Sequence, residues 1–247
     1  MTNTSFSIYG ADRPARWLIT CDHASNSVPA DINGGDLGIG ADNMSRHIAF
    51  DVGIKGTSQR LGELLDAPVI CSNFSRLVID PNRGMDDPTL VMRLYDGTII
   101  PANRHVDDPE IARRVDTLYR PYHEALESLA AARDNVIVVA MHSFSPKLNG
   151  RAPRPWEIGI LYSRTFQDFS HALLARLRRE TDLTVGENVP YDGHLPGDSI
   201  DQHALRQGRL NTLVELRNDE IETPEGQAAW AERLAPILTE ALAESGL

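Results

Sequence analysis

Apolar and polar positions along the chain form blocks that predict strands and amphipathic helices in turn. Short apolar runs near residues 17–21 and 135–140 are typical of strands that helices cover on both faces. Residues 109–133 and 225–244 instead repeat their apolar positions with helical spacing. This alternation predicts an α/β fold, a single three-layer α/β/α sandwich around a mixed, mostly parallel sheet. Without an internal repeat or a linker, residues 1–247 are expected to form one domain.

The remaining elements follow from the same patterns. Further strands are predicted at 68–71, 77–80, 158–162 and 212–216, and further helices at 42–66, 166–180 and, as a short turn, 200–207. Pro121 and Pro236 are expected to kink their helices, because proline removes one hydrogen bond and clashes with the preceding turn. Gly53 and Gly56 weaken the middle of the 42–66 helix, where a break or close packing is expected.

Two of the predicted strands lead into histidines. Asp22, His23 and Asn26 come directly after the first apolar run, and His142 comes after the run at 135–140. In open α/β sheets, ligands bind in the crevice outside the carboxyl ends of the strands. His23 and His142 are therefore candidates to meet at a metal, although a strand-end histidine can equally be a hydrogen-bonding surface group.

Composition narrows the classes of partner. The formal net charge of −11 argues against nucleic acid or an anionic membrane surface as a partner, because binding either would need a basic surface. No apolar run approaches the roughly 20 residues of a membrane span, and the first residues lack the pattern of a signal peptide. Two cysteines, Cys21 and Cys71, cannot build a disulfide framework. We therefore expect a cytoplasmic protein, with no membrane or nucleic-acid partner and an oligomeric state that the sequence leaves open.

A zinc ion is the metal that fits the two histidines best. Catalytic zinc usually has three protein ligands, often two histidines and a carboxylate, and it lowers the pKa of bound water to about 7. Asp51 is the preferred third ligand, one helical turn from His47 on the predicted helix. Asn26, three residues after His23, is the second choice, because a neutral amide is a poor zinc ligand beside a carboxylate.

Glu215 is the candidate for the proton-transferring group. It lies in the middle of the predicted strand 212–216, where burying a charge is costly unless it is paired or used. Arg217 is two residues away and so on the same face of the strand, which makes a structural ion pair the competing interpretation.

Arginines in irregular segments are candidates to bind an acidic substrate. Arg76, Arg83 and Arg104 lie in such segments, and a guanidinium holds a carboxylate through two parallel hydrogen bonds. Asn82 and Arg83, directly after a predicted strand, are the best placed of this group. Any one of these arginines can also be a surface ion pair.

Several motifs resemble one family. Residues 23–29 (HASNSVP), 75–83 (SRLVIDPNR), 121–123 (PYH), 141–144 (MHSF) and 214–219 (VELRND) are similar, in order, to the N-formylglutamate amidohydrolases. The His-Ser-Phe and Glu-Leu-Arg segments also resemble the third-ligand and general-base regions of zinc carboxypeptidases and succinylglutamate desuccinylases. The chain departs from those relatives at Asn26, where they carry a glutamate.

The resemblance implies a phosphorylase/hydrolase-like domain that cleaves the amide bond of an N-acyl amino acid. The reference activity converts N-formyl-L-glutamate to formate and L-glutamate, in histidine breakdown. It implies that His23, His142 and Asp51 hold zinc and that Glu215 moves the proton. Arg83, helped by Arg76 or Arg104, would bind the substrate carboxylate, and Tyr191 or His194 would close over the site and donate to the oxyanion.

Three alternatives remain open. A cysteine amidase would use Cys21 or Cys71 with His142. A divergent, non-catalytic member of the family would bind an acidic ligand without turning it over. An active member could also take a different acyl group or amino acid.

Overall fold

The protein is built around one seven-stranded sheet. The structure, a computed structural model, describes residues 5–148 and 150–247. Strand order is β1-β3-β2-β6-β9-β7-β8. The strands are β1 (Phe6–Tyr9), β2 (Trp17–Cys21), β3 (Val69–Ser72), β6 (Ile137–Phe144), β7 (Ile158–Leu161), β8 (Val185–Glu187) and β9 (Leu210–Arg217). The four central strands β3, β2, β6 and β9 are parallel, while β1 and β7 pair antiparallel with their neighbours. The predicted mixed, mostly parallel sheet is confirmed.

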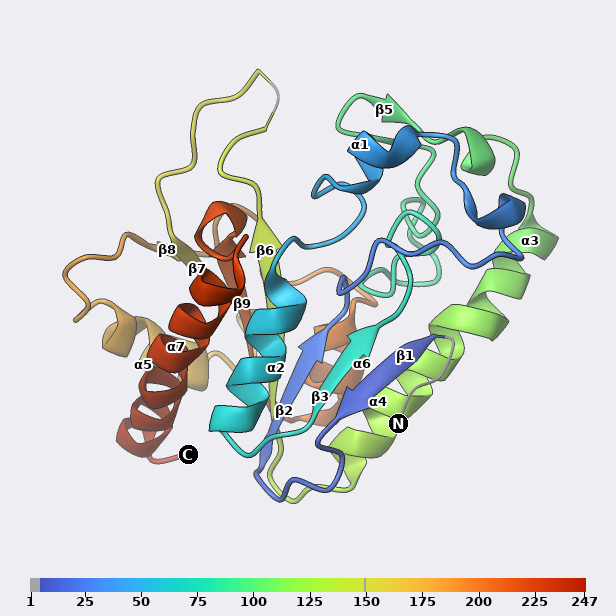
Figure 1. Cartoon of the computed structure of the whole chain (residues 1–247). Coiled ribbons are helices and arrows are strands. Elements are labelled where there is room, and N and C mark those ends of the chain that lie inside the picture. The colour runs from blue at the N-terminus through green and yellow to red at the C-terminus, as the bar shows by residue number, and fades with distance from the viewer. Residues whose placement is uncertain (1–4, 149) are drawn as a thin grey trace.

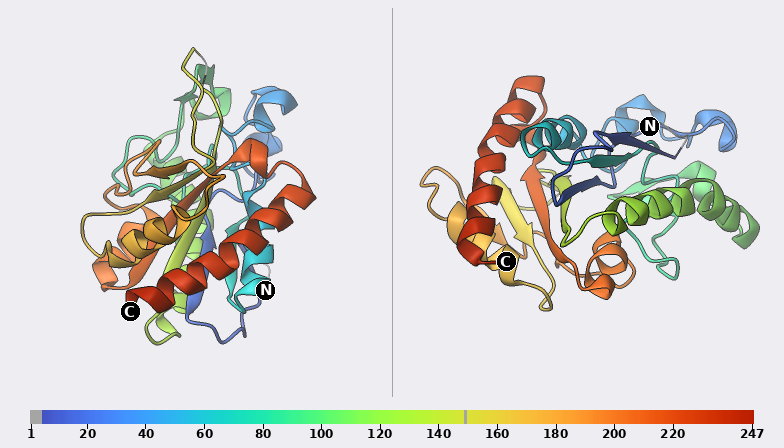
Figure 2. Two further views of the ribbon diagram at one scale, coloured as in Figure 1. Left: turned by 90° about the vertical axis from the view of Figure 1, so that its left-hand side faces the viewer. Right: turned by 90° about the horizontal axis from the view of Figure 1, so that it is seen from below.

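Helices cover both faces of this sheet, as Figures 1 and 2 show. On one face, α2 (Ile54–Leu64), α5 (Asp168–Leu177) and α7 (Pro224–Ser245) enclose the largest hydrophobic cluster. On the other face lie α4 (Arg120–Ala131) and α6 (Ser199–His203). The predicted α/β/α sandwich is therefore confirmed, and none of the described helices is long and apolar enough to cross a membrane.

A second layer of loops and short helices lies above the carboxyl ends of the parallel strands (Figure 1). It has its own hydrophobic cluster, centred on Phe74, Leu77 and Ile79. Its elements are η1 (Asn33–Gly35), α1 (Gly40–Met44), β4 (Leu94–Tyr95), β5 (Thr98–Ile99), η2 (Pro101–Asn103) and α3 (Asp108–Arg114). A cavity lies between this layer and the carboxyl edge of the sheet.

The helix predicted over 42–66 is divided in two, and the break expected in its middle lies at Gly53. The chain forms α1 and α2, separated by a turn that ends at Gly53. Gly53 has a φ of 79°, and a Cβ there would lie 2.0 Å from the carbonyl oxygen of Ile221. Conformation and space therefore both require glycine at this position. The break places Asp51 in the turn rather than on a helix.

The strand predicted over 77–80 is wrong. Leu77, Val78 and Ile79 are buried, but they form part of a turn. Side chains satisfy their carbonyl groups in place of a neighbouring strand: Asn103 Nδ2 donates to Leu77 O at 2.7 Å, and Arg114 donates to Val78 O at 2.8 Å. An apolar run can therefore be buried without joining a sheet.

Neither of the two long helical runs ends at its proline. Residues 108–131 form one continuous helical run in which the π-helical segment η3 (Val115–Tyr119) joins α3 to α4 just before Pro121. A widened turn at this point accommodates the missing N–H of the proline. Pro236 lies inside α7, which runs on to Ser245. The remaining short helices are η4 (Leu205–Gln207) and η5 (Asn218–Glu220).

Candidate metal centre

Three segments that are distant in the sequence meet at the carboxyl edge of the sheet. His23 lies two residues beyond β2, and His142 lies within β6, which extends further than predicted. Asp51 reaches them from the turn before α2, where its backbone N–H donates to the carbonyl oxygen of His23 at 2.9 Å. Because this hydrogen bond ties the turn to the end of β2, the carboxylate lies directly beside both imidazoles.

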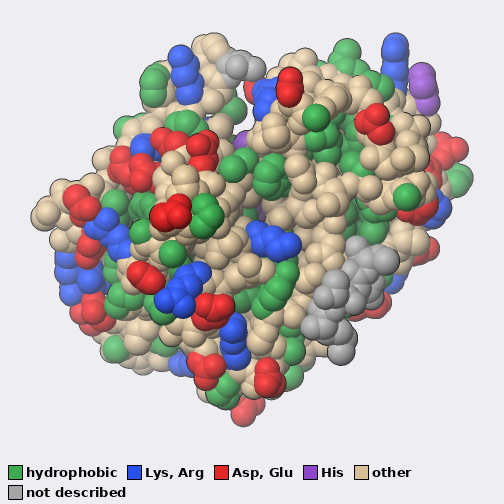
Figure 3. Space-filling view, viewed as in Figure 1, with side chains coloured by type: hydrophobic (Ala, Val, Ile, Leu, Met, Phe, Trp, Pro, Cys, Tyr) green, Lys and Arg blue, Asp and Glu red, His purple; other side chains and the backbone are tan. Residues whose placement is uncertain are grey.

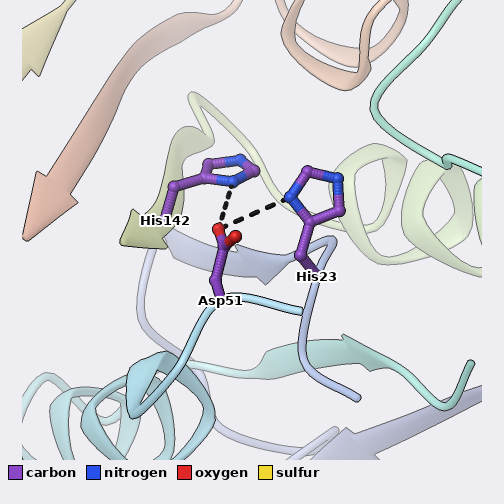
Figure 4. Close-up of side chains that lie close together, drawn as sticks. All are labelled: His23, Asp51 and His142. Atoms are coloured by element: carbon purple, nitrogen blue, oxygen red, sulfur yellow. Dashed lines mark hydrogen bonds and ion pairs between the residues drawn. The ribbon is translucent and has the colours of Figure 1, made fainter. Parts of the chain in front are cut away.

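Both imidazoles approach the same carboxylate oxygen (Figure 4). Oδ2 of Asp51 lies 3.0 Å from Nδ1 of His142 and 3.4 Å from Nδ1 of His23. It also accepts a hydrogen bond from the backbone N–H of Ser143. All three side chains are buried, and among the described residues they form the one group of histidines, cysteines and carboxylates compact enough to hold a metal ion.

A further carboxylate contacts the other nitrogen of each histidine. Oδ1 of Asp80 lies 2.7 Å from Nε2 of His23, and Oδ2 of Asp22 lies 3.5 Å from Nε2 of His142. Since an ionised carboxylate can only accept, the proton of His23 belongs on Nε2 and its Nδ1 keeps a lone pair. A carboxylate behind each imidazole is the usual outer arrangement of a histidine-ligated metal.

Charges in the cluster leave an excess of negative charge. Burial opposes the ionisation of Asp22, Asp51 and Asp80, but His142 and His23, together with Arg76, outweigh it and lower the pKa of all three, that of Asp22 to about 2. Arg76 donates to Asp80 and lies 3.6 Å from Asp51. Against the effect of burial, Asp22 and Asp51 in turn raise the pKa of His142, so this imidazole holds a proton that a metal ion would displace. With both imidazoles neutral, three carboxylates and one guanidinium leave two formal negative charges, which a divalent cation would balance.

The same cluster contains buried polar atoms without a hydrogen-bond partner. They include Nδ1 of His23, Oδ1 of Asp51 and Nε2 of His142. Leaving such an atom unsatisfied costs about 1–3 kcal/mol. Coordination of a metal would satisfy the first two, so the donor set and the local charge both fit a zinc ion.

Glu215 lies beside His142 on the neighbouring strand. The two residues are paired in register on β9 and β6, so their side chains leave the same face of the sheet. Burial raises the pKa of Glu215 to about 8 against the opposing charge of His142, and its Oε2 has no hydrogen-bond partner. Arg217, the competing structural partner, forms its ion pairs with Glu157, Asp219 and Glu220 instead.

The cluster opens into a cavity of about 240 Å³. Figure 3 shows a hollow in the surface between the loop that joins β6 to β7 and the α1–β5 layer, which Figure 1 locates in the same view. Its walls contain the cluster and residues from several loops. The lining residues are His23, His47, Asp51, Arg76, Asn82, Arg83, Tyr95, His142, Ser143, Leu161, Tyr191, Asp192, Leu195, Asp198, Leu213 and Glu215.

Of the candidate substrate-binding residues, four line this cavity: Asn82, Arg83, Arg76 and Tyr191. Arg83 is held by Thr89 Oγ1 at 3.1 Å and by the carbonyl oxygen of Asn82 at 2.7 Å. These bonds leave other N–H groups of its guanidinium available. Arg76 is instead committed to the carboxylates of the cluster.

Three candidates lie elsewhere. Asn26 is exposed and donates to the carbonyl oxygen of Met44 at 2.9 Å, so it does not contact the metal cluster. Arg104 is exposed at the end of η2 and does not line the cavity. His194 lies 3.6 Å from Asp201, also outside the cavity lining. Loop conformation, which the sequence pattern does not encode, decides all three positions.

Cys21 and Cys71 lie on the other face of the sheet. They are register partners on β2 and β3 and belong to the cluster under α2 and α7, whereas His142 faces the opposite side. Burial raises the pKa of the Cys21 thiol well above its usual range. A buried, protonated thiol facing away from the cavity is not a nucleophile for a reaction there.

Several residues near the cavity were not among the candidates predicted from the sequence. Tyr95 and Asp198 line it, and Arg154 lies beside it with its guanidinium over the ring of Tyr191 at 5.3 Å. Tyr95 and Arg154 come from irregular segments, where no periodicity marks a position as facing a cavity. For Asp80, the four-residue spacing from Arg76 was an available signal.

Fold and site together define a class: α/β proteins with a buried histidine–carboxylate cluster at the carboxyl edge of a mixed sheet. The chain belongs to the N-formylglutamate amidohydrolase family, whose model matches residues 15–222.

Two solved structures are similar over nearly the whole chain. A gene product of Agrobacterium tumefaciens is 34% identical, with 99% of this chain and 97% of that chain covered and a TM-score of 0.90. The N-formylglutamate amidohydrolase of Ralstonia eutropha JMP134 is 20% identical, with 99% and 100% covered and a TM-score of 0.77, which shows a shared fold. No curated protein matches the chain.

Proposed function

We propose that this protein is a zinc-dependent amidohydrolase that cleaves the amide bond of an N-acyl amino acid. The products are the free amino acid and the carboxylate of the acyl group, with N-formyl-L-glutamate as the first substrate to test. One observation carries the proposal: a buried His23–Asp51–His142 group with unpartnered donor atoms lies beside the buried carboxyl of Glu215, the register partner of His142.

His23 through Nδ1, His142 through Nδ1 and Asp51 through its carboxylate would hold the zinc ion. When bound, zinc supplies a Lewis acid that lowers the pKa of water and polarises the scissile carbonyl. Asp80 orients His23, and Asp22 faces the outer nitrogen of His142. Tyr122 donates in turn to Asp22, which fixes that carboxylate from the side of α4.

Glu215 transfers the proton in both halves of the reaction. In its ionised form, which a divalent cation held nearby would favour, Glu215 takes a proton from the attacking water as oxygen bonds to the acyl carbon. It then delivers that proton to the amide nitrogen as the C–N bond breaks. No side chain is left altered, because the proton returns to the leaving amine. Burial against β6 and β7 keeps bulk water from competing for this proton.

Arg83 and Asn82 bind a substrate carboxylate in this proposal. Asn82 is anchored because its Oδ1 accepts from the backbone N–H of Ser199 at 3.2 Å, and Arg83 is anchored through Thr89. A preorganised guanidinium loses little side-chain entropy when it binds a carboxylate. Tyr191, whose side chain is partly exposed at the cavity, is the remaining candidate to donate to the oxyanion.

Glu215→Gln tests the proposal. The amide keeps the shape but cannot accept a proton, so kcat should fall by about 10²- to 10⁴-fold while zinc content stays at the wild-type value. Glu187→Gln is the matched control, because Glu187 is a glutamate outside the cavity, bonded to Tyr162 and Arg178. Turnover within tenfold of wild type in Glu215→Gln would contradict the role of Glu215. A wild-type protein that binds zinc and N-acyl amino acids without cleaving them would instead indicate the non-catalytic alternative.

A further inference from the structure

Two loops lie between the metal-cluster cavity and a second cavity of about 800 Å³. The loops are in close contact, because a Cβ on Gly84 would lie 2.9 Å from the carbonyl oxygen of Pro196. A contact made on the side of the second cavity can therefore fix a group that faces the metal cluster. In each loop some residues line the metal-cluster cavity and their neighbours line the second one: 82–83 against 84–87, and 195 and 198 against 196–197.

Two side chains of the long helical run hold the backbone of the first loop. The hydroxyl of Tyr119 donates to the carbonyl oxygen of Arg83 at 2.9 Å, and Nε2 of His123 donates to that of Pro81 at 3.0 Å. Tyr119 and His123 are four residues apart, so they share a face of the helical run, and both line the second cavity. The carbonyl groups on either side of Asn82 are therefore both held from that cavity.

Gln202 of α6 orients the hydroxyl of Tyr119. Its Nε2 donates to the hydroxyl oxygen of Tyr119 at 2.8 Å and to the carbonyl oxygen of Gly197 at 2.6 Å. Because the hydroxyl oxygen accepts from Gln202, its own proton is directed at the carbonyl of Arg83. Tyr119 is buried, so water does not compete for these bonds. One tyrosine hydroxyl thus connects the two loops through α6.

The position of the first loop decides where the guanidinium of Arg83 lies. Nη1 of Arg83 donates to the carbonyl oxygen of Asn82 at 2.7 Å, so the side chain is bonded to the backbone of its own loop. At the start of the loop, the backbone N–H of Asn82 donates to Oδ1 of Asp80 at 2.9 Å, the oxygen that also contacts His23. The loop is therefore tied to the metal cluster at one end and to Tyr119 at the other.

We infer that Tyr119 is a positioning residue for substrate binding: its hydroxyl holds the loop so that the guanidinium of Arg83 meets the substrate carboxylate at a fixed distance from the metal cluster. This inference rests on the proposed function, in which Arg83 binds that carboxylate. Tyr119 does not line the metal-cluster cavity, so its effect on the substrate passes through Arg83. A displaced guanidinium binds the carboxylate more weakly and leaves the proton transfer by Glu215 unchanged.

Tyr119→Phe tests the inference, because it removes the hydroxyl and keeps the ring. We expect KM for N-formyl-L-glutamate to rise by about 3- to 10-fold, the range for one neutral hydrogen bond, with kcat within about twofold of wild type. Tyr162→Phe is the matched control. The hydroxyl of Tyr162 donates to Glu187, outside both cavities, so this variant should keep both constants at the wild-type values.

A double-mutant cycle with Arg83→Gln separates positioning from a role in stability alone. Arg83→Gln should raise KM by about 10- to 100-fold, since it removes a hydrogen bond between charged groups. If Tyr119 acts through Arg83, adding Tyr119→Phe to Arg83→Gln should change KM by less than about twofold. An increase in KM by the same factor in both backgrounds, a loss confined to kcat, or an unchanged KM in Tyr119→Phe would overturn the inference.

Product binding gives a readout that does not depend on turnover. In calorimetric titrations, Tyr119→Phe should weaken L-glutamate binding by about 3- to 10-fold, and Arg83→Gln should weaken it further. Wild-type affinity in Tyr119→Phe together with weakened binding in Arg83→Gln would overturn the inference alone. Wild-type affinity in Arg83→Gln would contradict the proposed role of Arg83 and the inference with it, and a wild type that cleaves no N-acyl amino acid would contradict the proposed activity.

Discussion

Two pairs of buried histidines in this protein have nearly equal distances between their rings, but their ring nitrogens have different hydrogen-bond partners. The rings of His23 and His142 are 5.0 Å apart and tilted by 67°, and those of His123 and His203 are 5.1 Å apart and stacked at 17°. The first pair faces a carboxylate and retains unpartnered nitrogens. In the second pair every ring nitrogen has a partner.

The second pair forms a closed chain of hydrogen bonds. Nδ1 of His123 lies 2.8 Å from Nε2 of His203, Nε2 of His123 lies 3.0 Å from Pro81 O, and Nδ1 of His203 lies 3.0 Å from Glu127. Arg209 also donates to Glu127. This pair lines the larger cavity, about 800 Å³ against about 240 Å³. The volume of a cavity therefore does not indicate chemistry here, whereas unsatisfied donors next to buried carboxylates do.

Removing the shared carboxylate should have the largest effect. Asp51→Asn takes away the anionic ligand and should reduce zinc to near zero per chain and turnover by about 10³-fold or more, since the metal contributes several kcal/mol to the barrier. Metal analysis and initial rates measure both effects. Glu127→Gln, the equivalent change at the second pair, should leave zinc content at the wild-type value.

Removing the carboxylate behind His23 should have a smaller effect on the same site. Asp80→Asn loses the partner that orients the imidazole, and zinc affinity should fall by about 10- to 100-fold. Competition with a chromogenic chelator measures the dissociation constant. An unchanged constant would mean that Asp80 serves only to pair Arg76.

At the second pair, substitution should change stability rather than metal binding. His203→Gln leaves Nδ1 of His123 and part of Glu127 without their partners, at a cost of about 1–3 kcal/mol in the free energy of unfolding. Urea denaturation of the zinc-loaded protein measures this cost. Loss of zinc from the folded variant would show that the two pairs are not independent.

The smallest expected effect is on how the free energy of unfolding depends on pH, compared between the wild type and a His123 variant. Burial lowers the pKa of His123 from 6.5 to about 3. Between these two pH values the unfolded chain binds a proton at this histidine and the folded chain does not. Stability is therefore lost as pH falls below 6.5, by about 1 kcal/mol between pH 6.5 and 5.5. His123→Gln should show a shallower decline over this range when denaturation curves of the two proteins are compared. Parallel declines would contradict this account of His123.

The elements that the sequence predicted well are those in which local pattern and tertiary burial agree. The apolar runs of β2 and β6 and the helical spacing of α7 needed no distant contact to be recognised. His23 and His142 could be singled out because they lie where parallel strands end, and Glu215 because a charge inside an apolar strand is costly.

The rest depends on contacts that no local pattern encodes. Asp51 reaches the histidines because the chain turns at Gly53; the glycine indicated a break or close packing, but not that Ile221, far along the chain, would be its neighbour. Leu77 resembled a strand residue, yet the side chain of Asn103 satisfies its carbonyl. Arg154 lies in an irregular loop, and only the fold brings it next to Tyr191.

Anomalous diffraction at the zinc absorption edge tests the central claim most directly. Crystals grown with one equivalent of zinc should give a single strong peak in contact with Nδ1 of His23, Nδ1 of His142 and the carboxylate of Asp51, and none beside His123 and His203. A peak at the second pair, or no peak at the first, would contradict the account.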